Sequence, residues 1–336
     1  MSIEINSSQY KIIDKIGEGG FGKIYKVLNE NTNLFYAIKE FSIKDEKEEN
    51  IRYIQKEADI LSSFNSNNIV KYYGSSQIND KFYILMEYCD SGNLKNFIDK
   101  FRAKDELIKE NKLKDIINKI ILGIQEIHDK NIIHRDLKPE NIFLNNKNEI
   151  KIGDFGVAKQ LTAYKKYTLT KGIGTLYYSS PEILKGNNYD NKVDIWSLGC
   201  IIYELFNLSV YHLDKISNEV KSINEDYNPK WQELINLLFI IDFNKRPNIY
   251  KIKEFIYINN FFLARKKFDI DENIKMPKIR KIISSNSYEK FDNEIVKLIE
   301  KNKIHEIQRK KNIYNFLNLV LVLGESGVGK TCLIEK

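Results

Sequence analysis

The sequence contains 336 residues, enough for one large domain or two ordinary ones. Apolar residues make up 42% and charged residues 29%, which allows a substantial buried core and excludes a wholly disordered or collagenous chain. The 53 basic and 46 acidic residues give a net charge of +7, so an anionic partner such as nucleic acid or a membrane surface has to be considered.

The cysteines indicate a reducing compartment. Cys89, Cys200 and Cys332 are scattered singly and cannot form a disulfide framework or a metal-binding cluster, so we expect a cytoplasmic protein. The N-terminal residues have neither a basic start nor an apolar run, and no signal peptide is predicted. The longest apolar stretch, 193–206, contains two acidic residues and is too short to span a bilayer.

The first ninety residues are dominated by strand-like patterns. Alternating apolar and polar residues predict strands over 10–17, 23–28, 34–39, 69–73 and 82–88. Apolar residues spaced by three and four predict helices over 45–63, 94–101, 113–128, 193–206 and 231–241. The fold class is therefore α+β: a small strand-rich lobe followed by a larger helical lobe, with a cleft between them.

The rest of the chain has a different character. We expect a tail over 1–9, the two-lobed domain over 10–262 (lobes 10–88 and 89–262), a basic and partly helical linker over 263–315, and a final segment over 316–336. The linker holds 14 basic and 8 acidic residues and so supplies +6 of the net charge. Because the remainder is nearly neutral, we expect no specific nucleic-acid partner. The linker charge is either simply solvated or binds weakly to an anionic surface or an acidic protein.

A glycine-rich motif lies between the first two predicted strands. The string Gly17-Glu-Gly-Gly-Phe-Gly22 fits G-x-G-x-x-G, which in a dinucleotide-binding fold would open a helix. Here strand-like sequence continues through Ile24 and Val27, so a hairpin turn over phosphate groups is the better interpretation. Glycines allow backbone N–H groups to approach anionic oxygens closely.

A lysine and a glutamate follow this motif at suggestive positions. Lys39 lies on the next predicted strand and Glu57 on the first predicted helix. A lysine held by a glutamate can neutralise nucleotide phosphates. Taken alone, however, two such residues are more often an ordinary surface ion pair.

Two further motifs favour phosphoryl transfer. They are His134-Arg-Asp-Leu-Lys-Pro-Glu-Asn141 and Asp154-Phe-Gly156. This chemistry requires a carboxylate near the attacking hydroxyl, metal ligands, and positive charge around the moving phosphoryl group. Asp136 provides the first and Lys138 the positive charge, while Asn141 and Asp154 provide hard oxygen ligands suited to Mg²⁺.

With these motifs in this order, residues 10–262 resemble the eukaryotic protein kinases. The resemblance implies ATP and Mg²⁺ as cofactors and proteins as substrates, with Asp136 as the catalytic base and Lys138 on the γ-phosphate. It also implies that Thr175 hydrogen-bonds Asp136 and Lys138, an arrangement that is typical of serine/threonine kinases. Asn141 and Asp154 would bind the metal.

The resemblance also implies an ATP site made of the glycine turn, the adenine pocket and the phosphate-binding residues. Met86 corresponds to the gatekeeper, and the backbone of Glu87 and Cys89 would recognise adenine between Ala37 and Phe143. The implied ATP-binding residues are Ile16, Gly17, Glu18, Gly19, Gly20, Phe21, Gly22, Lys23, Ile24, Ala37, Lys39, Glu57, Met86, Glu87, Cys89, Phe143 and Asp154.

Supporting contacts follow from the same resemblance. Glu182 is expected to pair with Arg246, and Asp194 to brace the catalytic loop. A hydrophobic stack linking the lobes is expected from Leu61, Tyr72, His134 and Phe155.

Within the kinases, the sequence is most similar to the NIMA-related (NEK) family. The similar strings begin at Asn68, Met86, Asn141, Gly174 and Asp194. The kinases that phosphorylate the alpha subunit of translation-initiation factor 2 share several of these strings and remain an alternative.

Two departures from the kinase pattern affect substrate recognition and the end of the activation segment. Only 26 residues separate Glu204 from Trp231, fewer than the family usually has where a substrate-docking helix lies. Ser180 replaces the usual alanine of the Ala-Pro-Glu motif.

The segment 154–182 resembles a kinase activation segment and contains two candidate phosphosites, Thr168 and Thr170. Phosphate on one of them, added by an upstream kinase or by autophosphorylation, is expected to pair with Arg135. The spacing is one residue off, since Lys171 occupies the usual phosphosite position before Gly174.

The final segment contains a second nucleotide motif. After a buried-type strand, Gly324-Glu-Ser-Gly-Val-Gly329-Lys330-Thr331 fits the Walker A pattern and resembles the opening of a Ras-superfamily GTPase, particularly of the Rab branch. Only five residues follow Thr331, so we expect no GTP hydrolysis and regard the segment as a vestigial P-loop. It is either a truncated gene product or the front of a longer fusion.

Two rival functions remain to be weighed. A pseudokinase scaffold is disfavoured because Lys39, Glu57, Asp136, Asn141 and Asp154 are all present. A guanine-nucleotide switch based on 324–331 is disfavoured because that domain is incomplete. We therefore predict an ATP-dependent protein serine/threonine kinase.

Overall fold

The structure is a computed structural model that describes residues 2–19, 22–44, 46–147, 149–156, 158–160, 173–211, 220 and 222–259. The chain divides into two compact units, Met1–Phe262 and Leu263–Lys336, and all the described residues belong to the first. The predicted linker and the P-loop-like segment lie outside the described residues. The boundaries 262 and 315 therefore stay predictions.

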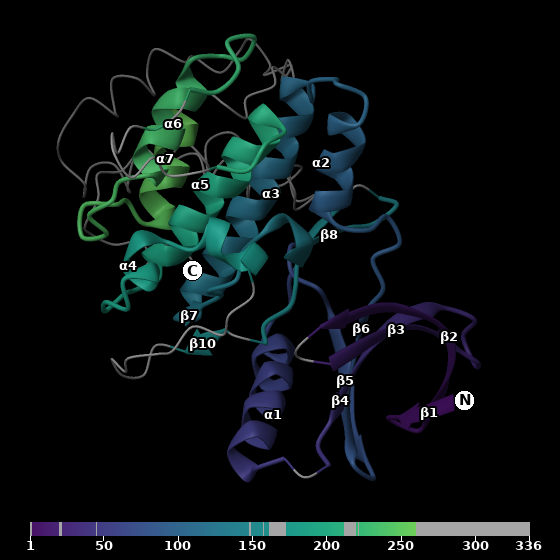
Figure 1. The fold of residues 1–336 in the computed structure, drawn as a ribbon. Coiled ribbons are helices and arrows are strands. Elements are labelled where there is room, and N and C mark those ends of the chain that lie inside the picture. The colour runs from purple at the N-terminus through teal and green to yellow at the C-terminus, as the bar shows by residue number, and fades with distance from the viewer. Residues whose placement is uncertain are drawn as a thin grey trace, which may run out of the picture. The chain divides into compact units, whose positions relative to one another are not determined.

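The small lobe is built on a six-stranded antiparallel sheet with the strand order β1-β2-β3-β4-β6-β5 (Figure 1). The strands are β1 Ser2–Ile5, β2 Ser8–Gly19, β3 Gly22–Asn29, β4 Phe35–Ser42, β5 Tyr72–Ile78 and β6 Lys81–Glu87. Helix α1, Glu48–Ser62, contacts the sheet at β5 and buries Glu57, Ala58, Ile60 and Leu61. The strands and the helix predicted for this region are therefore confirmed in type.

The first residues of the chain are not the tail that was predicted. Ser2–Ile5 forms β1, which pairs with β2 through a turn at Asn6 and Ser7, both with positive φ. Ile3 and Ile5 alternate with exposed polar residues and are buried in a small core on the sheet. The Asn6 amide also donates to the Tyr73 carbonyl (3.1 Å), so β1 contacts β5.

The strand predicted over 69–73 begins later than expected. Ile69 forms only an isolated bridge with Ile152 of the large lobe, and the Val70 N–H donates to the Ile152 carbonyl (2.9 Å). Because this segment pairs with the large lobe, its backbone groups are not available to the small-lobe sheet. Strand β5 therefore starts at Tyr72.

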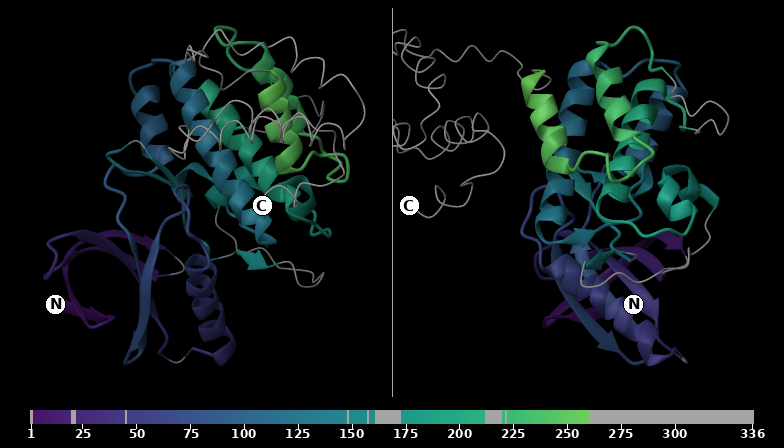
Figure 2. Two further views of the ribbon diagram at one scale, coloured as in Figure 1. Left: turned by 180° about the vertical axis from the view of Figure 1, so that it is seen from behind. Right: turned by 90° about the vertical axis from the view of Figure 1, so that its left-hand side faces the viewer.

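The large lobe consists mainly of helices α2 Leu94–Arg102, α3 Glu110–Asp129, α5 Lys192–Asn207, α6 Lys230–Leu238 and α7 Ile249–Ile258. Helix α5 is central, and every residue from Val193 to Phe206 is buried, as its largely apolar sequence predicts. The views from behind and from the side show the helices grouped apart from the sheet and α1 (Figure 2). The predicted small strand-rich lobe and larger helical lobe are therefore confirmed.

The remaining elements of the large lobe are short. They are β7 Ile132–Ile133, η1 Pro139–Asn141, β8 Ile142–Leu144, β9 Ile150–Ile152, β10 Lys159–Gln160, η2 Ile173–Tyr178 and α4 Pro181–Leu184. Strand β8 pairs with β9, and β7 with β10. Within the part of the chain that the structure describes, no helix is long and apolar enough to cross a membrane.

Candidate active site

The loop 134–141 is held in place by the carboxylate of Asp194, which is fully buried on α5. The backbone N–H groups of His134 and Arg135 both donate to this carboxylate at 2.9 Å. Arg135 has a φ of 68°, a left-handed conformation that costs energy in a non-glycine residue and is maintained by these bonds. Asp194 therefore braces the loop, as predicted.

His128 also reaches Asp194, which sequence reasoning missed. Its Nε2 lies 2.9 Å from the Asp194 carboxylate, and its side chain is buried in the last turn of α3. The predicted helix 113–128 places this residue correctly at a helix end. The sequence pattern does not predict the contact, because Asp194 lies 66 positions away.

Asp136 lies at the centre of this loop with one carboxylate oxygen occupied. Lys138 Nζ donates to Asp136 Oδ2 at 2.7 Å, and the Asn141 amide donates to the same oxygen at 3.0 Å and to the Asp136 carbonyl at 2.8 Å. The other oxygen, Oδ1, is buried and has no hydrogen-bonding partner among the described residues. A buried, unpaired carboxylate oxygen is costly, and it is suited to accept a hydrogen bond from a bound hydroxyl group.

Lys39 lies between two carboxylates that come from different parts of the chain. Its ammonium group is 2.7 Å from Glu57 on α1 and 2.8 Å from Asp154, which follows β9. Lys39 and Glu57 are both buried, which excludes the surface-pair interpretation. The arrangement places one cation and two anions at a single point, as nucleotide and metal binding require.

The pKa values in this cluster follow from burial and charge together. Burial alone would lower the pKa of Lys39, but the charges of Glu57 and Asp154 outweigh it, and the pKa is raised. Burial raises the pKa of Glu57 despite the opposing charge of Lys39. Burial alone would also raise the pKa of Asp154. The charge of Lys39 and the hydrogen bond that it donates act in the opposite direction, and the pKa of Asp154 is lowered. At neutral pH Lys39 is therefore a cation and Asp154 an anion.

Aromatic packing fixes the segment that carries Asp154. Phe155 is buried, with its ring centroid 4.9 Å from that of His134 and 5.4 Å from that of Phe64. Leu61 belongs to the same buried cluster and Tyr72 packs against that cluster, while the contact of Phe155 with His134 is the part of the predicted stack that the structure shows directly. Phe64 was not foreseen, because it lies just after α1 and outside the recognised motifs.

Some of the residues expected to enclose adenine lie close to this segment in the structure. Ala37 and Met86 are direct neighbours in the β4–β6 register, and a Cβ on Gly153 would come within 2.9 Å of Phe143 and 2.8 Å of Val70. Gly153 is therefore required by close packing against Val70 and Phe143, and the contact with Val70 was not expected from the sequence. Burial raises the pKa of the Cys89 thiol to about 12.

The backbone of Cys89 is suited to recognise a planar ligand. Neither its N–H nor its carbonyl bonds to another described residue, whereas the Glu87 N–H is used by the Lys71 carbonyl (2.8 Å). Peptide groups without a partner in the described chain are donors and acceptors of the kind that a nucleobase edge can use.

The strands on both sides of the glycine-rich motif pair with each other, as the predicted hairpin requires. Glu18 pairs with Lys23 and Gly19 with Gly22, so strand structure continues on both sides and no helix begins here. Gly22 has a φ of 132°, and a Cβ at this position would lie 2.2 Å from the Glu40 carbonyl oxygen. Ile16 lies at a register irregularity of β2 and is half exposed, while Ile24 pairs with Lys39 on β4.

Several predicted site residues cannot be placed. Thr175 belongs to η2 by its backbone, but its side chain is not among those described. The following residues lie outside the described parts: Gly20, Phe21, Thr168, Thr170, Gly324, Gly329, Lys330 and Thr331.

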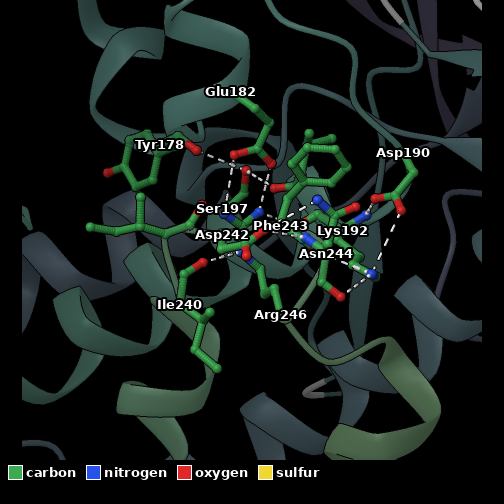
Figure 3. Close-up of polar contacts among 12 residues, drawn as sticks. Tyr178, Glu182, Asp190, Lys192, Ser197, Ile240, Asp242, Phe243, Asn244 and Arg246 are labelled. Carbon is green, nitrogen blue, oxygen red and sulfur yellow. Dashed lines mark hydrogen bonds and ion pairs between the residues drawn. The ribbon is translucent and has the colours of Figure 1, made fainter.

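The predicted pair of Glu182 and Arg246 is present and buried (Figure 3). Both Arg246 Nη atoms donate to the Glu182 carboxylate, at 2.7 and 3.1 Å. The other donors of the guanidinium group reach the carbonyls of Ile240, Ile241 and Lys192. All five N–H groups are thus used, and the pair ties α4 to the loop before α7.

A second buried carboxylate in this lobe, Glu204 on α5, was not foreseen. Its side chain is fully buried and accepts from the hydroxyl of Tyr178 (2.5 Å), from Lys95 (2.9 Å) and from Arg102 (3.1 Å). These three donors come from η2 and α2. The apolar sequence around Glu204 indicates that the helix is buried, but it does not reveal the partners of the Glu204 carboxylate.

Comparison with known proteins shows that this chain is similar to protein kinases. A family model described as a protein kinase domain matches residues 10–301. A serine/threonine-protein kinase of Dictyostelium discoideum, pakH, is 38% identical over 200 residues, which is 59% of this chain and 37% of that protein. Mouse Nek1 is 34% identical over 255 residues (73% and 21%), and human Nek5 is 35% identical over 262 residues (75% and 37%). The chain thus matches well under half the length of each of these relatives.

Proposed function

Because this chain belongs to the protein kinase family and is similar to serine/threonine kinases of the NEK type, we propose that it transfers the γ-phosphate of ATP to serine and threonine hydroxyl groups of proteins. One observation carries the proposal: the buried oxygen Oδ1 of Asp136 has no partner in the described chain, while Lys138 and Asn141 orient the same carboxylate. A scaffold protein would gain nothing from leaving this oxygen unpaired.

The chemistry follows from this geometry. The acceptor hydroxyl donates to Asp136 Oδ1, and its oxygen attacks the γ-phosphorus as the bond from that phosphorus to the leaving ADP oxygen breaks. The hydroxyl proton passes to Asp136. Lys138, 2.7 Å from the Asp136 carboxylate, supplies positive charge for the transferring group.

The nucleotide is held by residues of both lobes. Adenine fits between Ala37 and Phe143 with its edge on the free peptide groups of Cys89, and Lys39 pairs with the α- and β-phosphates. The glycine hairpin supplies backbone N–H groups above the phosphates.

The residues present fit a magnesium ion. Asn141 uses its amide nitrogen on Asp136, which leaves its amide oxygen for a metal, and the lowered pKa of Asp154 keeps that carboxylate anionic. No cluster of three or more His, Cys, Asp or Glu suited to a metal occurs in the described residues. Mg²⁺ commonly takes one or two protein ligands and completes its shell with water and phosphate oxygens. When bound, it neutralises charge on the phosphates.

A radioactive transfer assay tests this function. The full chain is incubated with Mg²⁺, [γ-³²P]ATP and dephosphorylated casein, and Asp136→Asn is compared with wild type. We expect incorporation by wild type and a reduction of about 100-fold or more in the variant, since a positioned general base typically contributes that much. Asp115→Asn, an exposed aspartate on α3, is the matched control and should retain activity. Absent incorporation by wild type, or equal incorporation by wild type and Asp136→Asn, would contradict the proposal.

We also propose that phosphate on Thr168 or Thr170 orders the activation segment through Arg135, whether an upstream kinase or autophosphorylation adds it. Supporting this, Arg135 lies in the catalytic loop, and its guanidinium group donates to the Tyr189 hydroxyl (3.1 Å). The Thr168→Ala/Thr170→Ala double variant should lose most of its activity. Full activity in that variant would contradict the idea.

The proposal also covers the location of the protein, the basic linker and the P-loop-like segment. The scattered cysteines support a cytoplasmic location, and the basic linker provides either solvated charge or weak contacts with acidic partners. The P-loop-like segment at 324–331 resembles the start of a small GTPase in sequence, and it takes no part in the proposed kinase reaction. Its NEK-like sequence favours that kinase type over the initiation-factor kinases.

A further inference from the structure

Glu204 is a buried charge that the phosphoryl-transfer mechanism does not use. Its side chain has no exposed surface, and two cations of α2, Lys95 and Arg102, reach its Oε1 at 2.9 and 3.1 Å. Asp99, on the same helix, contacts both cations and holds them on this side of α2. An unpaired buried carboxylate is strongly destabilising, and these two cations supply the paired charges that Glu204 needs at this buried position.

The second oxygen of Glu204 holds Tyr178. The phenol donates to Oε2 at 2.5 Å, and burial, followed by the charge of Glu204, raises the pKa of Tyr178 far enough to keep the phenol protonated. At its other end, the Tyr178 carbonyl accepts from the Ser197 hydroxyl at 2.8 Å (Figure 3). Tyr178 is therefore fixed to α5 at two points, by its side chain and by its backbone.

Tyr178 is the last residue of η2, the element that contains Thr175, and it lies close enough to the catalytic loop for the charge of Glu140 to act on its phenol. Helix α5 also carries Asp194, which holds the catalytic loop at His134 and Arg135. One rigid helix thus anchors both the catalytic loop and the segment beside it.

Helix α2 is joined to α5 and to the nucleotide side of the cleft. Arg102 Nε donates to the carbonyl of Leu208 (2.5 Å), the left-handed residue that ends α5. At the opposite end of α2, its N-cap residue Asn93 forms a bridge with Phe143 on β8. The two cations therefore fix the spacing between α2 and α5.

We propose that Lys95 and Arg102 are positioning residues for the protein substrate: by holding the Glu204 carboxylate, they fix Tyr178 and with it the segment that places the acceptor hydroxyl next to Asp136. This inference rests on the proposed kinase function. The contacts of the two cations run to Glu204, to Asp99 and, for Arg102, to the Leu208 carbonyl, and we assign their effect on the acceptor to the contact with Glu204. Their loss should therefore affect the use of the protein substrate and leave the binding of ATP unchanged.

The test measures both substrates separately in the full chain. Steady-state transfer from [γ-³²P]ATP to dephosphorylated casein gives kcat/KM for casein and KM for ATP in wild type, in Lys95→Met/Arg102→Met and in Tyr178→Phe. We expect kcat/KM for casein to fall by about 10-fold or more in both variants, since a misplacement of about 1 Å can cost about 100-fold. KM for ATP should stay within about twofold of wild type, because Lys39, Asp154 and Phe143 are untouched.

Controls separate this role from general destabilisation. Lys119→Met on α3 removes a cation of similar exposure (27% against 25% for Lys95) that pairs with Asp115, and it should leave both parameters unchanged. Tyr178→Phe removes a single hydroxyl group and preserves the ring, so it tests the idea even if the double variant fails to fold. A casein kcat/KM within twofold of wild type in Tyr178→Phe, or a parallel rise in KM for ATP, would overturn the inference. Inactive wild-type protein would instead refute the proposed function itself.

Discussion

The ammonium group of Lys39 lies 2.8 Å from the carboxylate of Asp154, although 115 positions separate the two residues. Glu57 approaches the same ammonium from α1 at 2.7 Å. Lys39 is therefore shared between a carboxylate that belongs to the small lobe and one that is expected to bind metal. The balance between these two contacts determines how strongly Lys39 competes for Asp154.

Removing the charge of Glu57 should shift this balance. In Glu57→Gln, Lys39 is left with Asp154 as its only anionic partner among the described residues, and it should hold that carboxylate away from the metal. We expect KM for Mg·ATP to rise about 10-fold, which corresponds to about 1.4 kcal/mol, with KM for casein unchanged. Glu49→Gln, an exposed position on the same helix, is the control. An unchanged KM for Mg·ATP in Glu57→Gln would show that the ion pair has no part in nucleotide binding.

Asp194 should give stability a distinctive dependence on pH. Burial would raise the pKa of Asp194, but hydrogen bonds from His128 and the backbone of Arg135 lower it below its usual value. A lowered folded-state pKa stabilises the protein above the unfolded pKa of about 3.9, and that contribution is lost as the pH falls through the folded pKa. Urea unfolding should therefore show Asp194→Asn less stable by about 3 kcal/mol at pH 7, with a smaller deficit below about pH 4. A deficit that is constant over this range would contradict the assignment.

Arg246 should not tolerate replacement by lysine. The guanidinium group uses all five of its N–H donors, and an ammonium group offers only three without the planar geometry that matches Glu182. We expect Arg246→Lys to reduce the free energy of unfolding by about 3–5 kcal/mol. The neighbouring Lys245 is 79% exposed, and Lys245→Ala should change it by less than about 0.5 kcal/mol. Equal effects of the two substitutions, measured by chemical denaturation, would show that the buried pair is not needed.

Two glycines of the same hairpin should respond differently to alanine. A Cβ on Gly22 would lie 2.2 Å from the Glu40 carbonyl oxygen with a positive φ, whereas a Cβ on Gly17 would meet nothing closer than 3.5 Å. Gly22→Ala should cost about 2–4 kcal/mol and weaken the increase in melting temperature caused by Mg·ATP. Gly17→Ala should cost less than about 1 kcal/mol. Similar losses in both variants would mean that backbone strain is not the deciding factor.

The N-terminal strand should contribute to the stability of the small lobe. Ile5 is 1% exposed within the small core that includes Val27 and Ile38. Ile5→Ala should reduce the free energy of unfolding by about 2–5 kcal/mol, while Glu4→Ala, on the opposite face of β1, should change it by less than about 0.5 kcal/mol. Chemical denaturation of the two variants distinguishes a structural strand from a tail, because a tail would leave both unaffected.

Sequence reasoning succeeded where chemistry imposes a fixed spacing. Asp136, Lys138 and Asn141 lie within six residues, so a local motif fixes their relative positions before any tertiary contact is known. The lobes were predictable for a similar reason, because alternation and helical spacing are local patterns. The ion pair of Lys39 and Glu57 became predictable only through the resemblance to kinases, since 18 residues separate the two.

The features that were missed depend on contacts across the fold. Tyr178 and Lys95 reach Glu204 from 26 and 109 positions away, and no periodic pattern signals such a meeting. Strand β1 was missed because four alternating residues are too few to distinguish a strand from a polar tail. The later start of β5 also results from a contact across the fold. The backbone groups of Ile69 and Val70 pair with Ile152 in the large lobe and not with the small-lobe sheet.

The contact of Asn6 with Tyr73 has a consequence for self-association. β1 and β5 are the edge strands of the small-lobe sheet, and exposed edges are templates on which a second chain can add a strand. Because the turn after β1 is hydrogen-bonded to β5, each edge is partly covered by the other. Residues 2–7 thus protect the small lobe against edge-to-edge aggregation.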